Sequence, residues 1–146
     1  MYYTEDERSK ALQLAVDTIN NLTNACTEYT RGINDCFALV AEYDLALRGK
    51  SKARDIVKMP WKSTKDWFVK LARKGYTVEE YAEYCGYELV KNKRPKLGDI
   101  AFYEGGMINE GYFWISTRED NTGVFNRLPV FFYERKIPII ARPIRS

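Results

Sequence analysis

The sequence predicts an α+β fold in which N-terminal helices pack on a mainly antiparallel sheet. Two observations support this. Apolar residues recur at helical spacing through the first ninety positions, and short aromatic and β-branched runs separated by turn residues follow from about Lys91. Helices followed by sequential short strands are typical of α+β architecture. The 146 residues make room for one domain, 1–146, with 1–90 mainly helical and 91–146 mainly strands.

The first helix is expected to begin at Thr4, because Glu7 three residues later completes a capping box. The apolar residues that then share one face are Leu12, Ala15, Ile19 and Leu22. Residues 26–31 are predicted to connect this helix to the next.

The central helix is predicted over about 34–48, between capping residues and a glycine stop. Asn34 and Asp35 are both good N-cap residues, Gly32 allows a sharp turn before them, and Gly49 is suited to the C-terminal end. Positions 36, 39, 40, 43, 46 and 47 share one face, so Cys36 is expected at the start of a core-facing stripe.

Cys36 supports two interpretations. The positive end of a helix dipole favours a thiolate, which is the environment that a nucleophilic cysteine needs. Alternatively, Cys36 is a buried small apolar residue, as most free cysteines are.

Further helices are predicted after Ser63 and after Thr77, with Gly75 and Gly86 as their stops. Between Lys50 and Lys58 the sequence predicts a basic loop or a short helix around 53–57.

Asp44 interrupts the apolar central helix. A solvent-facing edge is the favoured explanation, and a buried partner for an arginine is the alternative.

The strands are expected in short runs with brief connections, one of them at an edge because of Pro138. These runs are 97–103, 111–116, 123–125, 130–133 and 137–141.

Charge is unevenly distributed along the chain. Residues 48–98 hold 14 Lys and Arg against 6 Asp and Glu, whereas 1–47 hold 3 against 8. Such a segment is expected to meet a partner through salt-sensitive contacts or to be a solvated face. Charge reversal at the run Lys91, Lys93, Arg94 and Lys96 tests the first interpretation. The basic residues form no recognisable nucleic-acid-binding motif, so nucleic acid is not a favoured partner.

The chain contains no histidine, which excludes histidine metal sites and any Ser-His or Cys-His catalytic pair within it. Its three cysteines, Cys26, Cys36 and Cys85, lack metal-ligand spacing and favour a reducing cytoplasm over a disulfide scaffold. We therefore expect no cofactor and no metal. No apolar run approaches the ~20 residues of a membrane span, and the polar stretch 2–8 does not resemble a signal peptide.

Two motifs carry a resemblance to a known family. Gly32-Ile-Asn-Asp-Cys36 opens a buried helix, and Gly98-Asp99-Ile100 enters a strand about sixty residues later. Together they resemble the NlpC-type branch of the papain-like cysteine peptidases, which cut bacterial peptidoglycan, and above all its small relatives encoded among phage tail-tip genes. The resemblance covers nearly the whole chain and implies an NlpC/papain-like fold with Cys36 as the nucleophile.

The family's catalytic histidine lies in a His-hydrophobic-Gly-hydrophobic motif on the second strand. Laying that motif on this chain places Asn109 at the histidine position and Gly111 within the motif. An asparagine cannot act as a general base, a role that contributes ~10²–10⁴-fold to rate. Glu110 is the nearest carboxylate, but strand alternation points it away from the face of Asn109.

The favoured interpretation is thus a catalytically degenerate NlpC-like protein, a structural or assembly component of a phage tail tip. An active cysteine endopeptidase or amidase using Cys36 with another base is the first alternative. The second is an intracellular phage protein that binds a host factor through its basic surface. The resemblance implies synthesis in the host cytoplasm, location in the virion, and other tail proteins or peptidoglycan as partners.

Overall fold

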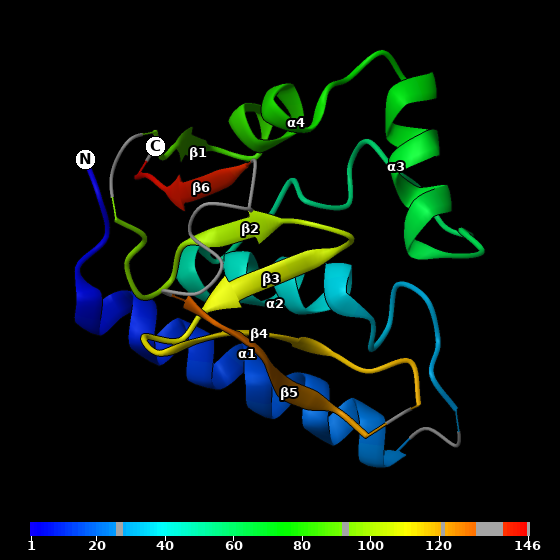
Figure 1. Cartoon of the computed structure of the whole chain (residues 1–146), viewed down its shortest axis with the longest axis horizontal. Helices are drawn as coiled ribbons and strands as arrows, with labels where there is room; N and C mark the ends of the chain where they lie inside the picture. The colour runs from blue at the N-terminus through cyan, green and yellow to red at the C-terminus, as the bar shows by residue number, and fades with distance from the viewer. Residues whose placement is uncertain (26–27, 92–93, 121, 131–138, 146) are drawn as a thin grey trace.

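A computed structural model describes residues 1–25, 28–91, 94–120, 122–130 and 139–145 of the chain. Within these ranges, four helices are followed by a six-stranded antiparallel sheet (Figure 1). The helices are α1 (Glu5–Ala25), α2 (Cys36–Arg48), α3 (Thr64–Arg73) and α4 (Val78–Tyr84). The predicted α+β class, with helices first and an antiparallel sheet after them, is confirmed.

The sheet is ordered β1-β6-β2-β3-β4-β5, and each neighbouring pair is antiparallel. Its strands are β1 (Tyr87–Leu89), β2 (Ile100–Phe102), β3 (Gly106–Asn109), β4 (Phe113–Thr117), β5 (Val124–Pro129) and β6 (Ile140–Pro143). The β2–β3 hairpin lies at the centre and is paired as Ile100 with Ile108 and Phe102 with Gly106. The hairpin turn, residues 103–105, therefore projects from the middle of the sheet.

Local capping sets the helix boundaries as the sequence predicts. Thr4 and Glu7 exchange the two hydrogen bonds of a capping box at the start of α1, and Thr77 and Glu80 do the same at α4. The Ser63 hydroxyl accepts from the Asp66 amide at the start of α3. Gly49 ends α2 with φ 77°, a left-handed conformation that glycine adopts without a steric penalty.

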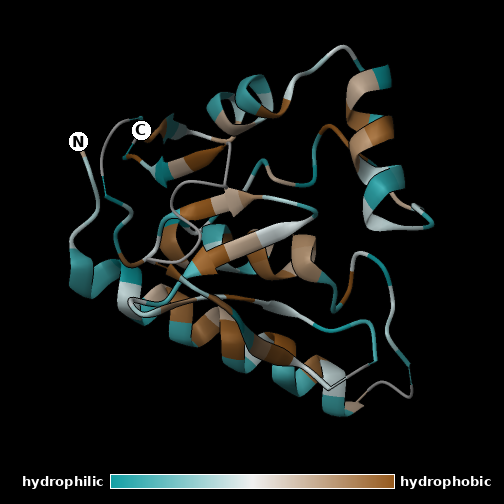
Figure 2. Ribbon diagram, viewed as in Figure 1, coloured by the Kyte–Doolittle hydropathy of each residue, from teal (hydrophilic) through white to brown (hydrophobic). Residues whose placement is uncertain are grey.

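The main core lies between α1, α2 and one face of the sheet (Figure 2). A smaller apolar cluster, with Trp114 and Met107 at its centre, lies apart from it. Helix α2 is buried along more than its predicted stripe, since Phe37, Ala38 and Ala41 are buried together with Cys36, Leu39, Val40 and Tyr43. A helix covered on most sides is held firmly, which fixes the position of its N-terminus.

Two features differ from the sequence expectations. Strands β1 and β3 were not predicted. Residues 50–58 form turns and bends, in agreement with the predicted basic loop and not with the alternative short helix around 53–57. The solvent-facing interpretation of Asp44 is wrong. Its side chain is fully buried, and it pairs with Arg48 at 2.6 Å and accepts from Ser51 at 2.6 Å, because an i, i+4 arginine reaches it across one helical turn. The strand predicted at 130–133 and Pro138 lie outside the described residues, apart from Val130.

The two ends of the described chain lie side by side (Figure 1). Tyr2 forms a β-bridge with Ile144, and the Arg145 amide donates to the Met1 carbonyl at 2.8 Å. Among the described helices, none combines the length and apolar character required to cross a bilayer.

Candidate functional site

Cys36 is the first residue of α2, and the β2–β3 turn closes on its side chain. Only 6% of the residue is exposed. A Cβ atom built on Gly105 would lie 3.1 Å from the Cys36 sulfur and 3.4 Å from Thr64 Cγ2. A Cβ on Gly106 would lie 3.2 Å from the Cys36 carbonyl oxygen and 2.9 Å from Val40 Cγ2. The two glycines let the strand approach the helix this closely.

Burial, rather than the helix dipole, controls the ionisation of Cys36. Desolvation and the neighbouring Asp35 carboxylate together raise the pKa of the thiol to about 12, against smaller lowering effects of the Gly106 amide, Arg31 and Arg127. Of the two interpretations from the sequence, the helix-dipole argument expected a lowered pKa, whereas the buried apolar residue agrees with the raised value. The dipole argument did not allow for a side chain with almost no access to water, in which the uncharged thiol is strongly favoured.

Polar side chains from four segments lie near this end of α2. Arg31 is central among them: its guanidinium approaches the Tyr29 hydroxyl at 3.3 Å and Thr64 Oγ1 at 3.4 Å, and it pairs with Glu119 at 2.8 Å. Arg127 of β5 donates to the Tyr103 carbonyl at 3.2 Å and lies 3.6 Å from Glu104, which holds the β2–β3 turn from the other side. These contacts hold the turn against Cys36.

Asp35 acts as a structural cap. One carboxylate oxygen accepts from the Ala38 amide at 2.9 Å and the other from the Trp61 indole nitrogen at 3.1 Å. Burial raises the pKa of this carboxyl against the lowering effect of its hydrogen bonds. Gly32, at φ 81°, faces Met59 and the Trp61 ring, so the predicted sharp turn packs under the same tryptophan. Both residues brace the start of α2.

Asn109 lies at the opposite end of β3 from Gly106, which faces Cys36. Asn109 is three residue steps along the strand from Gly106, or about 10 Å at the usual rise. The Asn109 amide donates to the Asp99 carbonyl at 2.8 Å, and its side-chain oxygen accepts from the Gly111 amide at 2.7 Å. Glu110 is likewise engaged locally, accepting from the Tyr112 and Phe113 amides. The structure therefore does not bring Asn109 to Cys36.

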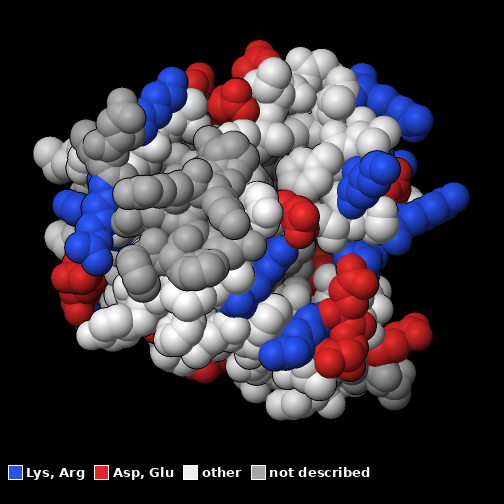
Figure 3. Space-filling model, in the orientation of Figure 1, with Lys and Arg blue, Asp and Glu red and all other residues white. Residues whose placement is uncertain are grey.

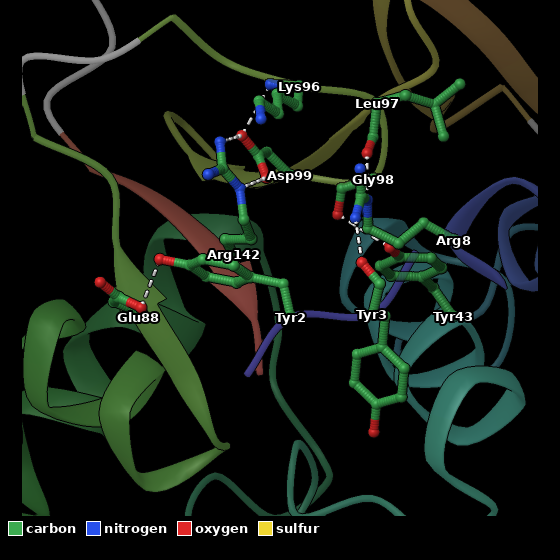
Figure 4. Close-up of polar contacts among 10 residues, drawn as sticks. All are labelled: Tyr2, Tyr3, Arg8, Tyr43, Glu88, Lys96, Leu97, Gly98, Asp99 and Arg142. Atoms are coloured by element: carbon green, nitrogen blue, oxygen red, sulfur yellow. Dashed lines mark hydrogen bonds and ion pairs between the residues drawn. The ribbon is translucent and has the colours of Figure 1, made fainter. Parts of the chain in front are cut away.

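Gly98 and Asp99 belong to a buried polar network at this far end (Figure 4). The Gly98 carbonyl accepts from the Tyr43 hydroxyl at 2.9 Å, and the Gly98 amide donates to the Asn109 carbonyl at 2.7 Å. Asp99 is fully buried and bound by Arg142 through two hydrogen bonds of 2.8 and 2.9 Å. Arg8 donates to the carbonyls of Leu97 and Tyr3. These contacts join the turn before β2 to α1, α2 and β6.

The residues singled out in the sequence thus fall into two groups, one at each end of α2. Gly32, Asp35 and Cys36 lie at its N-terminus, and Gly98, Asp99, Asn109 and Gly111 lie near Tyr43, ~10 Å along the helix. Sequence reasoning missed Arg31, Thr64, Gly105 and Arg127 around Cys36. Only Arg31, five residues before the cysteine, carried a usable signal.

Within the described ranges, no group of three His, Cys, Asp or Glu side chains could hold a metal ion.

Comparisons of the chain with protein-family models, with curated proteins and with solved structures gave no match.

Proposed function

We propose that this protein is a catalytically inactive NlpC-like protein that serves as a structural or assembly component of a phage tail. The lack of catalysis is inferred from the environment of Cys36. The role in a phage tail is inferred from the resemblance of Gly32–Cys36 and Gly98–Ile100 to the small tail-tip relatives of the family.

The observation that carries the proposal is the burial of the Cys36 thiol, which favours its protonated form. A nucleophile must reach a carbonyl carbon at about 3–3.5 Å. Cys36 is only 6% exposed, and the β2–β3 turn comes so near that a Cβ atom built on Gly105 would lie 3.1 Å from the sulfur. With a pKa near 12, the thiol is almost entirely protonated at neutral pH.

Among the residues that the structure describes, we identify no base beside the thiol that would change this state. The chain has no histidine, and the nearest acidic group, Asp35, uses both oxygens to hold the Ala38 amide and the Trp61 indole. The cations Arg31 and Arg127 are engaged with Glu119 and with the β2–β3 turn. An arginine remains protonated at neutral pH and cannot accept the thiol proton.

The tail role is tested by genetics in the phage that carries the gene. Deletion should give particles with missing or incomplete tail tips in negative-stain electron micrographs, and the protein should be present in purified wild-type virions. A Cys36→Ala virus should assemble normal tails and infect with wild-type efficiency. Normal, infectious particles after deletion would contradict the structural role, and loss of infectivity in a folded Cys36→Ala variant would favour the peptidase.

A further inference from the structure

Helix α3 is held in place by the packing of its inner face. Its inner face buries Trp67 and Leu71, and the Trp67 ring stacks on Phe37 of α2 with the centroids 4.0 Å apart. Trp67 also packs edge-to-face on Tyr81 of α4 at 5.1 Å. Aromatic contacts of this kind hold the helix in one position, so its outer face is displayed without the entropy cost of ordering a loose segment.

Cations dominate the outer face of α3 and the loop that precedes it. Between Lys50 and Lys74 the chain has nine Lys and Arg but only two acids, Asp55 and Asp66. Lys and Arg side chains project from the edge of the molecule that α3 forms (Figure 3). We give the name α3 basic surface to six exposed cations of α3 and the adjoining loop: Arg54, Lys58, Lys62, Lys65, Arg73 and Lys74.

Most of these charges are not neutralised within the chain. Arg54 lies 3.6 Å from Glu42, and the half-buried Lys70 lies 4.0 Å from Asp66. Over the described residues, the other five members of the α3 basic surface form no ion pair. Unpaired like charges on a rigid element repel one another, and a complementary acidic surface would relieve that repulsion.

The loop is held alongside α2. It leaves the C-terminal end of α2 at Gly49, contacts Glu42 through Arg54, and reaches the N-cap Asp35 through Trp61. From there the chain enters α3 directly. The loop cations and the helix cations are therefore carried by one fixed region.

Exposed apolar side chains lie within this basic region. Met59 is 56% exposed and Val69 is 37% exposed, and Ala72 of α3 is also exposed. Apolar contacts surrounded by charged residues are typical of protein interfaces. The aromatic rings that could stack on nucleic-acid bases, Trp61 and Trp67, are buried here. These features favour a protein partner over single-stranded nucleic acid.

We propose that the α3 basic surface binds an acidic protein segment that presents an apolar side chain among its carboxylates. The apolar side chain would pack on Val69 and Ala72, and the carboxylates would pair with Lys65, Arg73 and their neighbours. The proposal does not depend on the tail role or on the state of Cys36.

The test measures fluorescence anisotropy with three labelled probes: a helical peptide of Glu with Leu at i, i+4 spacing, the same peptide with Ser for Leu, and a 20-base-pair DNA duplex. The wild type should bind the Glu/Leu peptide most tightly, and more weakly as salt rises. Lys65→Glu/Arg73→Glu should weaken that binding by about tenfold or more. Val69→Asp should remove the preference for Leu over Ser.

The matched control is Lys91→Glu/Lys96→Glu, which makes the same charge change in the segment joining β1 to β2. It should change the affinity by less than about twofold, because short-range pairing rather than net charge carries the binding. Circular dichroism checks the fold of each variant, and Lys58→Glu/Lys62→Glu in the loop provides a second test. The proposal is overturned by equal losses in the α3 and control variants, by tighter binding of DNA than of the peptide, or by no peptide binding.

Discussion

The β2–β3 turn brings Gly105 beside Cys36, and a Cβ atom built on this glycine would lie 3.1 Å from the cysteine sulfur. This contact joins the tip of the central hairpin to the start of the buried helix. The thiol is buried, and this desolvation is the largest cause of the raised pKa of Cys36.

Gly105→Ala should destabilise the protein, because φ is +146° here and the new methyl group meets the thiol. We expect a loss of about 1–3 kcal/mol in the free energy of unfolding, measured by urea titration. In a Cys36→Ala background the loss should be smaller, since the sulfur is gone. Gly75→Ala is the control, because φ is +88° there and nothing lies within 4 Å. Equal losses in the two Cys36 backgrounds would disprove the contact.

Asp35 should contribute to the stability of the fold through its two hydrogen bonds and not through its charge. Asp35→Ala loses both the helix cap and the acceptor for Trp61, at a cost of about 2–4 kcal/mol. Asp35→Asn keeps one acceptor and should cost about 1 kcal/mol. That smaller cost should largely disappear in a Trp61→Phe background, which removes the indole donor. Urea unfolding of wild type, the three single variants and Asp35→Asn/Trp61→Phe checks this, and an Asn variant as unstable as the Ala variant would refute it.

Breaking the Arg142–Asp99 pair should destabilise the protein more than breaking any exposed ion pair. Both side chains are buried, so Arg142→Ala leaves a fully buried carboxylate without its partner, at a cost of about 3–5 kcal/mol. Replacing the pair together, as Asp99→Asn with Arg142→Met, should cost less than Arg142→Ala alone. Arg145→Ala, which breaks the exposed pair with Glu7, is the control and should have a far smaller effect. Similar losses for Arg142 and Arg145 would argue against this network.

Stability should fall as the pH rises above the ordinary range of a thiol. Burial raises the pKa of both Cys36 and Cys85 to about 12, so the folded chain holds these protons more tightly than the unfolded chain. The stability that this contributes is complete below about pH 8.5 and is lost progressively as the pH rises towards 12. Urea unfolding at pH 8 and 9.5, below most tyrosine ionisation, should show the loss. A Cys36→Ala/Cys85→Ala variant should show a flatter dependence, and an unchanged slope would contradict the burial of the thiols.

Most helix boundaries were predictable because they depend on local sequence signals. Thr4 with Glu7, Ser63, and Thr77 with Glu80 marked helix starts, and Gly49 marked an end, since caps depend on a few neighbouring atoms. Strand β3 escaped prediction because its four residues, Gly106 to Asn109, are all buried, so no alternation of polar and apolar residues marks them. Strand β1 has only three residues and directly follows a helix.

Because strand β3 was not predicted, the candidate site was only partly predictable. Without β3, the motif alignment gave Asn109 the position opposite the cysteine, whereas Gly105 and Gly106 occupy it in the structure. The nucleophile interpretation of Cys36 expected a lowered pKa, and it disagrees with the structure for a related reason. The sequence shows that Cys36 begins a helix, but its desolvation is produced by a hairpin seventy residues later. Contacts of that range depend on how the strands pair.

If Cys36 is inactive, the purified protein should not cleave peptidoglycan, and digestion of peptidoglycan measures this most directly. Purified sacculi would be incubated with wild type and with Cys36→Ala, both shown to be folded, and released fragments would be counted by mass spectrometry. We predict that both proteins release no more than a buffer control. Release of stem-peptide fragments by the wild type, absent with folded Cys36→Ala, would contradict the account and identify an active cysteine peptidase.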